Sequence, residues 1–310
     1  MGTDTDQANL SNKRTGRSAI ERLWDRFGDI SDILRQNWMG KIGVGIFSFF
    51  LMLGVFGPYL APYNPTQIHR ASDGSALRLA EPSLAHPLGT TNLGRDVASQ
   101  VIIGARISIL VGVLAAFIAV FIGMNIGLIS GYFGGWVDDV LIRITDIAYG
   151  LPFLPFVLVL VFLLGPSIWS IALVISVLLW RSTARVVRSQ VLSHKERPYV
   201  ESARSIGASD TRIMYYHILP NVMPLAFLYG SFSVAWAVIA EASISFLGFG
   251  DPTMTSWGQI LFNAYSAGAI RFAWWWVVPP GVSIMLLVMS VFFIGRALEE
   301  LTNPELRHSK

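Results

Sequence analysis

The chain has 310 residues, of which 53% are hydrophobic and only 14% are charged, and its net charge is +3. A soluble domain has about a quarter charged residues, so most of this surface must face something other than water. The absence of cysteine excludes disulfides, thiolate metal sites and cysteine nucleophiles. The small net charge gives no argument for nucleic acid as a partner, and the polar first 40 residues contain no apolar signal-peptide segment.

The first 41 residues divide into two segments. Residues 1–19 are polar, and we expect them to form a disordered tail. From Ile20 to Trp38, apolar residues recur at helical spacing, while arginines and aspartates take the opposite face. Residues 20–41 are therefore predicted to form an amphipathic helix in the membrane interface, with packing against a partner protein as the alternative.

Six stretches of the remaining chain are predicted to cross a membrane. The hydrocarbon core of a bilayer is about 30 Å thick, which takes about 20 apolar residues in a helix. The predicted spans are residues 42–60, 107–129, 136–164, a stretch that starts near Ile168 and continues through Arg181, Arg185 and Arg188, and residues 223–247 and 274–294. The sequence thus predicts an all-α membrane protein with six transmembrane helices.

Glycines and prolines indicate how these spans are shaped. One run of glycines repeats every four residues and predicts a bare ridge that lets another helix approach closely; it consists of Gly123, Gly127 and Gly131. Pro58 and Pro62 are expected to end the first span. Pro152 and Pro155 are expected to bend the third span and to shape the helix beside a transport pathway.

Acidic residues at membrane depth are candidates for function. Asp146 lies in the polar first half of the third span, where helical spacing lets Arg143 pair with either Asp139 or Asp146. Glu241 is the deepest acidic residue of the fifth span. For Asp146 and Glu241, a role in the pathway and a role in holding helices together both remain open.

The two long loops are expected on one side of the membrane. Residues 61–105 form the first, in which Arg95 and Asp96 are candidates for an ion pair that tethers the loop. Residues 249–273 form the second, and three consecutive tryptophans from Trp274 onward suit the aromatic belt at the membrane surface.

Lysine and arginine residues predict the orientation of the spans. With the N-terminus in the cytoplasm, 18 of the 23 lysines and arginines lie in inner segments and 5 in outer ones. Positive charge accumulates on the cytoplasmic side of membrane proteins. Both termini, including the tail of residues 297–310, and the segment between the fourth and fifth spans are therefore predicted to be cytoplasmic.

That segment, residues 197–221, is a polar interruption with the sequence RPYVESARSIGASDTRIMYYHILPN. Pro198 suits a first helical turn, and Gly207 suits the left-handed residue that ends a helix. Asp210 is predicted to cap a second short helix, and Pro220 to end or bend that helix. The pattern predicts a compact helical knuckle outside the bilayer.

The turn of this knuckle is expected to be open to another surface. Ala203 and Gly207 leave it nearly bare of side chain, so a partner could approach the backbone closely. The alternative is a solvated linker that only joins two spans.

The knuckle resembles the EAA loop of ABC-importer permeases. The matching residues are Glu201, Ala203, Gly207, Ile218, Leu219, Pro220 and Asn221. The His-Ile-Leu-Pro-Asn ending is similar to the peptide/nickel (oligopeptide and dipeptide) branch, and residues 86–90, 94–96 and 104–108 resemble its C-type permease. Ser202 departs from the pattern, because the family more often has alanine there. The resemblance covers residues 37–296.

The resemblance implies a type I ABC-importer fold, with residues 106–296 as the permease membrane domain. In that family the loop is a cytoplasmic coupling helix that docks on an ATPase subunit. The residues expected to make this contact are Glu201, Ser202, Ala203, Arg204, Gly207, Ala208 and Asp210.

The resemblance also implies partners and a function. The chain would pair with a homologous second permease as a heterodimer, with two cytoplasmic ATPase subunits and with an extracytoplasmic substrate-binding protein. ATP and magnesium would be used by the ATPase subunits, and this chain would bind no cofactor. The expected function is ATP-driven import of peptides across the cell membrane, with oligosaccharides or nickel as alternative substrates.

Other chemistry finds no support in the sequence. It contains no phosphate-binding loop ending in Gly-Lys-Ser/Thr, no His-Glu-x-x-His and no Gly-x-Ser-x-Gly. The five histidines are scattered without a metal-ligand spacing. The run Gly248-Phe249-Gly250-Asp251 matches one motif of intramembrane aspartyl proteases, but a second aspartate motif is missing. We interpret this run as a helix-terminating turn, and we expect no catalytic or metal-binding residue.

Two other classes of membrane protein remain as alternatives. A secondary transporter would show inverted repeats with broken helices in both halves, whereas only the third span looks broken here. A membrane-embedded enzyme needs catalytic groups that converge, and no such set is evident in the sequence.

Overall fold

The computed structural model describes residues 37–302, with side chains as far as residue 299. The predicted N-terminal tail, most of the predicted amphipathic helix and the end of the C-terminal tail lie outside the described residues. Residues 38–41 of the predicted amphipathic helix already belong to the first long helix, α3 (Trp38–Leu60), which Asn37 caps. Pro58 lies inside the last turns of α3 rather than ending it.

The regular secondary structure of residues 37–302 is helical, and this described part of the chain contains no β-strand beyond isolated bridges. Five helices are long and apolar enough to cross a membrane, and the count reaches six if one bent pair of helices is a single span. The long helices are α3, α4 (Val97–Phe133), α7 (Ile168–Lys195), α10 (Leu219–Ile244) and α12 (Trp274–Thr302). The bent pair is α5 (Gly135–Gly150) and α6 (Phe153–Leu164). The predicted all-α architecture is confirmed.

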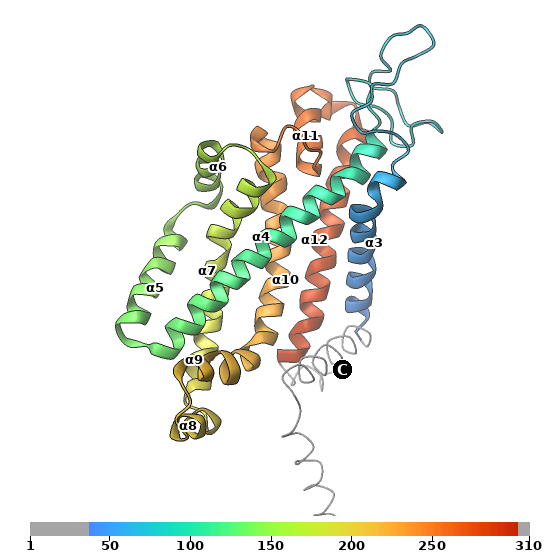
Figure 1. Ribbon diagram of the computed structural model, residues 1–310. Coiled ribbons are helices and arrows are strands. Elements are labelled where there is room, and N and C mark those ends of the chain that lie inside the picture. The colour runs from blue at the N-terminus through green and yellow to red at the C-terminus, as the bar shows by residue number, and fades with distance from the viewer. Residues whose placement is uncertain (1–36, 303–310) are drawn as a thin grey trace, which may run out of the picture.

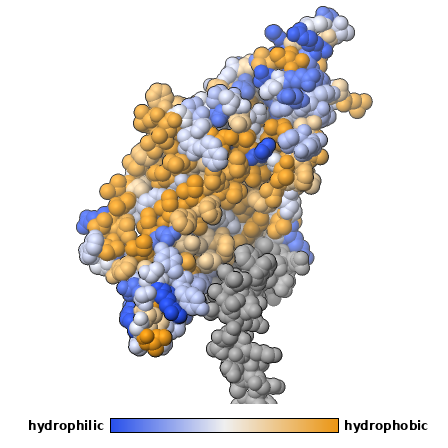
Figure 2. Space-filling model, viewed as in Figure 1, coloured by the Kyte–Doolittle hydropathy of each residue, from blue (hydrophilic) through white to orange (hydrophobic). Residues whose placement is uncertain are grey.

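The helices form a bundle with two polar ends. Figure 1 shows α4 crossing the bundle obliquely, with α3 and α12 on one side and α5, α6 and α7 on the other. Helix α8 (Pro198–Ser205) projects from one end, and the segment joining α3 to α4 projects from the opposite end beside α11 (Trp257–Ser266). Hydrophilic residues gather at these ends in Figure 2, and a largely apolar surface lies between them. This distribution suits a bilayer around the middle of the bundle.

The predicted glycine ridge is the contact between α4 and α7. A Cβ atom added to Gly123 would lie 2.4 Å from the carbonyl oxygen of Trp180, and one added to Gly127 would lie 2.5 Å from that of Ala184. Such distances leave no room for any side chain, so the two backbones pack directly against each other. Helices α4 and α7 are therefore the most closely joined pair along this side of the bundle.

Replacing Gly127 by leucine should separate these helices and destabilise the fold. Overpacking of a filled core costs about 1–3 kcal/mol. The control is Gly45→Leu on α3, because a Cβ atom at Gly45 meets nothing within 4 Å. Thermal unfolding of the purified chain in detergent, followed by tryptophan fluorescence, should show a lower midpoint for Gly127→Leu only. Equal midpoints for the two variants would contradict the close packing.

Helix α4 begins ten residues earlier than predicted, because Asp96 caps it. One carboxylate oxygen of Asp96 accepts hydrogen bonds from the backbone N–H and the hydroxyl of Ser99, each at 2.7 Å. The other lies 2.9 Å from Nδ1 of His86. The predicted Arg95–Asp96 tether was therefore wrong: Asp96 does tether the loop, but to His86 and to the start of α4.

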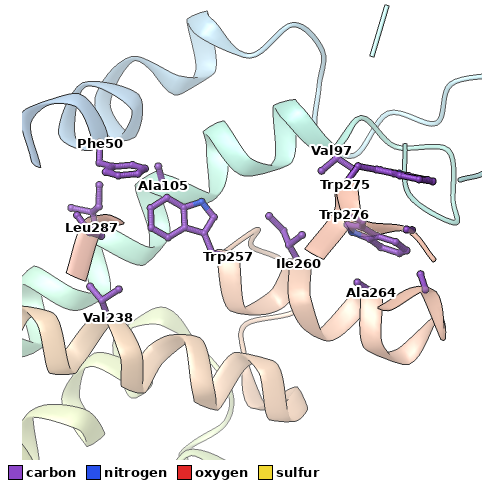
Figure 3. Packing of buried hydrophobic residues seen from close by; sticks show 13 residues of the cluster. Phe50, Val97, Ala105, Val238, Trp257, Ile260, Ala264, Trp275, Trp276 and Leu287 are labelled. Carbon is purple, nitrogen blue, oxygen red and sulfur yellow. The ribbon is translucent and has the colours of Figure 1, made fainter. Parts of the chain in front are cut away.

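The second predicted loop contains a helix that closes one end of the bundle. In α11, Trp257 is fully buried among Phe50, Ala105 and Leu287 (Figure 3). Its indole N–H donates to the carbonyl oxygen of Val101 at 2.9 Å. The predicted outer loop of residues 249–273 thus contains a helix whose inner face is packed in the core, while residues 252–254 and 270–272 are exposed. The preceding turn is as predicted, since Gly248 takes a φ of +89° where the helical segment ends.

The three tryptophans at the start of α12 have different environments. Trp274 is exposed, as expected of a residue in an aromatic belt. Trp275 and Trp276 are buried, and the indole N–H of Trp275 donates to the carbonyl oxygen of Thr90 at 3.3 Å. The belt prediction was therefore wrong for these two, which instead join α12 to the polar loop and to α11 (Figure 3).

The third span is broken, as its prolines predicted. Helices α5 and α6 meet at an angle of 93° across Leu151 and Pro152. Pro152 is the N-cap of α6, and Pro155 lies in the first turn of α6, where a missing N–H has no cost. The bend turns α6 back toward α7, as Figure 1 shows.

Candidate functional site

The predicted knuckle lies at one end of the bundle and consists of two helical pieces. Helix α8 (Pro198–Ser205) leads through a turn to α9 (Asp210–Arg212), which continues as the π-helix η1 (Ile213–Ile218). Pro198 occupies the first turn of α8, and Gly207 takes the left-handed conformation with a φ of +79°, both as predicted. These pieces, residues 198–218, make up most of the predicted knuckle of residues 197–221.

The second helix of the knuckle is capped by Ser209 rather than by the predicted Asp210. The hydroxyl of Ser209 accepts a hydrogen bond from the backbone N–H of Arg212. Asp210 instead accepts a hydrogen bond at 2.6 Å from the hydroxyl of Tyr132, which lies at the end of α4. Asp210 thus joins the knuckle to the membrane bundle, a role that its position next to a turn did not reveal.

Pro220, which was predicted to end or bend the second helix, does not end it, because the helical backbone passes from η1 directly into α10 (Leu219–Ile244). The π-helix widens the backbone just before it, and the N–H of Leu219 bonds the carbonyl of Met214 five residues earlier. Pro220 then falls in the first turn of α10, where its missing N–H is tolerated. The knuckle therefore runs without interruption into α10 (Figure 1).

The inner face of the knuckle is apolar and packed. Val200 and Ile213 are fully buried, and Ala203 is only 5% exposed. They pack in one cluster with Leu128 of α4 and Val187 of α7, among other residues. Ala203 was expected to leave an open surface, but its small side chain instead lets α8 lie close to the bundle.

The outer face of the knuckle is exposed. The side chains there that the sequence analysis assigned to partner contact are Glu201, Ser202, Arg204, Gly207 and Asp210, with Ala208 half-buried. A Cβ atom at Gly207 would meet nothing within 4 Å, so the turn is open on its outer side. Ile206 beside it is 85% exposed. Ile206 was not among the predicted contact residues, because a single apolar residue in a polar turn is ordinary and gives no signal in the sequence.

The junction between α7 and α8 is fixed by a second polar contact. The hydroxyl of Tyr199 lies 3.0 Å from Nδ1 of His194 in the last turn of α7. Burial raises the pKa of Tyr199 above its usual range, and the neutral phenol carries a proton that it can donate in this contact. Only Glu196 and Arg197 separate the two helices.

Two acidic residues of α5, Asp138 and Asp146, pair with arginines of α7 and not with Arg143. Asp146 lies 2.8 Å from Arg185, and both side chains are more than half exposed. Asp138 receives two hydrogen bonds of 2.6 Å from Arg188 and a third from Ser130 of α4. The predicted pairing of Arg143 within its own helix was therefore wrong for Asp146, because α7 supplies a closer cation.

Glu241 lies in the packed interior. It is 2% exposed and accepts hydrogen bonds from Ser245 at 2.8 Å and from Ser108 of α4 at 3.3 Å. The same Ser108 hydroxyl accepts from the backbone N–H of Trp257 at 3.3 Å. These bonds join α4, α10 and α11 around one carboxyl group. They favour the helix-packing role for Glu241 over a place in the pathway.

Two histidines that the sequence left scattered are neighbours in the structure. The rings of His69 and His86 are 4.6 Å apart between centroids, and His86 in turn contacts Asp96. Burial, then the adjacent His86, lowers the pKa of His69. Within residues 37–302, no three or more histidine and carboxylate side chains are grouped so as to hold a metal ion. His308 lies outside the described residues.

Comparison with known proteins identifies the family. Residues 123–307, more than half of the chain, match the model of the family described as the binding-protein-dependent transport system inner membrane component. The chain belongs to this family. Residues 26–82 additionally match the N-terminal transmembrane domain of oligopeptide transport permease C, which confirms the resemblance to C-type permeases.

Curated relatives of this permease match it over most of their length. The dipeptide transport system permease protein DppC of Escherichia coli (strain K12) is 36% identical over 93% of this chain and 94% of its own. DppC of Bacillus subtilis (strain 168) is 34% identical over 95% of this chain and 88% of its own. A putative peptide permease protein of Brucella suis biovar 1 (strain 1330) is 35% identical over 87% and 88%.

A solved structure shows the same fold. A chain of the MetNI methionine ABC transporter, described as having inward-facing conformations, aligns with a TM-score of 0.51 at 19% identity. The alignment covers 66% of this permease and 95% of the other chain. The predicted type I permease fold is therefore confirmed, and the family match of residues 123–307 includes the knuckle and the broken span.

The two faces of the knuckle should respond differently to a large side chain. Ala203→Leu should overpack the buried inner face and cost about 1–3 kcal/mol of unfolding free energy. Ser202→Leu, one residue away on the exposed face, should leave that free energy unchanged. Thermal unfolding of both variants in detergent checks this. A lower unfolding midpoint for Ser202→Leu, or an unchanged midpoint for Ala203→Leu, would contradict the assigned faces.

Proposed function

We propose that this permease forms half of the translocation pathway of an ATP-driven peptide importer. A homologous second permease supplies the other half, two cytoplasmic ATPase subunits power it, and an extracytoplasmic binding protein delivers the peptide. Family membership and the peptide and dipeptide permeases among the relatives support this proposal. ATP and magnesium act in the ATPase subunits, and catalysis is not a role of this chain.

The observation that carries the proposal is the two-sided construction of the knuckle. Its inner face is packed on α4 and α7, while its outer face around Gly207 and Ile206 is exposed. Polar groups and one apolar residue on a rigid support suit contact with a second protein. We infer that an ATPase subunit binds this outer face, with Glu201 and Arg204 as its charged contacts.

The mechanism follows from how the knuckle is joined to the bundle. It continues into α10 through η1, and only two residues separate it from α7. A displacement imposed on the outer face is therefore passed to α7 and α10. Helix α4 moves with α7, because their backbones are in direct contact along the glycine ridge. ATP binding would in this way switch the pathway between its two openings, as alternating access requires.

The proposal fixes the sidedness of the molecule. The excess of lysine and arginine supports a cytoplasmic location for the knuckle and both termini and an outer location for the loops around Asp96 and α11. Because the chain has no cysteine, the labelling of a single introduced cysteine reports on which side of the membrane that residue lies. Ser202→Cys should react with a membrane-impermeant maleimide only in inside-out vesicles, and Ser72→Cys only in right-side-out vesicles. The reverse pattern would refute the assigned orientation.

A bulky residue at Gly207 should uncouple transport without preventing assembly. Gly207→Trp places an indole on the outer face, where a docked ATPase would clash with it. The matched control is Gly135→Trp at the start of α5. That glycine also has a positive φ, of +51°, and open space around its Cβ position, so the backbone strain is comparable.

The assay is ATP-driven dipeptide uptake by the complete complex in proteoliposomes. Gly207→Trp should lose most uptake while the subunits still co-purify, and Gly135→Trp should retain it. Full uptake by Gly207→Trp, or an equal loss in both variants, would argue against docking at this face.

A further inference from the structure

A polar stripe runs along the contact between α5 and α7 at membrane depth. At 1.5 Å per residue, Arg181 lies about 20 Å along α7 from its outer end and Arg185 about 26 Å, within a hydrocarbon core of about 30 Å. Tyr149 and Asp146 of α5 face them. The stripe is these four residues, and it ends beside the break between α5 and α6.

The two arginines enclose the ring of Tyr149. The guanidinium carbons of Arg181 and Arg185 lie 4.8 Å and 4.3 Å from its centroid. Arg181 also donates a hydrogen bond of 2.5 Å to the carbonyl oxygen of Ala148, one of the carbonyls left free where α5 ends. Both guanidinium groups are thus held in place by α5.

The stripe carries one positive charge without a counter-ion. Arg185 is paired with Asp146 at 2.8 Å. Among residues 37–299, whose side chains the structure describes, no carboxylate lies within 4.0 Å of a nitrogen of Arg181. Arg188, one turn further along α7, is bound to Asp138 through two of its three guanidinium nitrogens and is not part of the stripe.

The stripe cannot face hydrocarbon. Asp146 and Arg185 have 58% and 57% of their side chains exposed, and charged groups at this depth face water or protein rather than lipid. The backbone break beside them is also exposed at Gly150 and Pro152. Such a break is tolerated within a membrane only against protein or a water-filled cavity.

A cavity next to the stripe favours water. It has a volume of about 280 Å³ and lies between α4, α5 and α7, with Asp146, Arg185 and Arg188 in its wall. A water molecule occupies about 30 Å³ in the liquid, so several fit. The wall is mostly apolar, and the charged groups of Asp146, Arg185 and Arg188 in it provide hydrogen-bond partners for water.

We propose that this stripe lines the translocation pathway and that Arg181 binds the carboxylate of the passing solute. The inference rests on the proposed function, since a peptide carries a terminal carboxylate. A guanidinium group binds carboxylates through two parallel hydrogen bonds. A single half-buried cation that no carboxylate neutralises holds such a group weakly, as a pathway that must also release its solute requires.

The test uses one cysteine beside the stripe in the assembled complex. Gly150 ends α5, a Cβ atom there meets nothing within 4 Å, and the chain has no other cysteine. The probes are two water-soluble methanethiosulfonates, one bearing an anionic sulfonate and one a cationic trimethylammonium. Relative to a free thiol, Gly150→Cys should react severalfold faster with the anionic reagent than with the cationic one.

Matched variants assign that preference to one side chain. Adding Arg181→Gln should abolish the preference, whereas Arg181→Lys should retain it. Arg271→Gln removes an arginine at the distant α11 end and should change nothing. Phe117→Cys, exposed on the apolar middle of α4, should react with neither reagent.

Protection by solutes tests the carboxylate itself. Glycyl-leucine should slow the anionic reagent at Gly150→Cys, its C-terminal amide should not, and Arg181→Gln should remove the difference. Absence of reaction at a cysteine that is titratable after denaturation would mean that protein covers the stripe, which overturns the proposal. A reaction without charge preference, a preference that survives Arg181→Gln, or equal protection by both peptides would overturn the carboxylate site.

The experiments distinguish failure of the carboxylate site at Arg181 from failure of the proposed import function. A complex that imports peptide in an ATP-dependent manner but shows no Arg181-dependent preference refutes only this inference. A complex that shows the preference but never imports peptide refutes the proposed function and leaves Arg181 as an anion site.

Discussion

The burial of the knuckle's apolar inner face against α4 and α7 is the contact on which the rest depends. Ala203 is small enough to let α8 approach Leu128 and Val187, and Tyr132 binds Asp210 from the same side. If this face were free, α8 would be a flexible linker and no force could pass through it. Because it is packed, the exposed turn at Gly207 is a rigid part of the membrane bundle.

The helices that support the knuckle are joined to it and to one another by different kinds of contact. Backbone contact along the glycine ridge makes α4 and α7 move together, and η1 carries the knuckle directly into α10. The bent pair α5–α6 is joined to α7 by a different set of contacts: Val157 and Val161 of α6 are buried in an apolar cluster, and Asp146 of α5 forms an exposed ion pair with Arg185. The bundle therefore combines backbone contact beneath the knuckle with a polar contact between α5 and α7 that borders a cavity.

Local patterns in the sequence correctly predicted features that depend on a few neighbouring residues, such as turns, helix breaks and the glycine contact face of a helix. The four-residue spacing of Gly127 and its neighbours, the left-handed Gly207 and the break at Pro152 were all correctly assigned. Contacts between distant segments were not predictable in this way. Arg185 rather than Arg143 pairs with Asp146, and Trp257 is buried because α3, α4 and α12 surround it. The helix continues through Pro220 because a π-helix precedes it, and no pattern in the sequence predicts that π-helix.

The most direct measurement is the distance between spin labels at Ser202→Cys on α8 and Phe133→Cys at the end of α4, in the complete complex with and without ATP. The cysteine-free chain permits this pair without other changes. If the knuckle is a rigid extension of α4 and α7, the distance distribution will be narrow and the same in both states. A broad distribution, or one that shifts when ATP binds, would show that α8 moves independently of the bundle and would contradict the account.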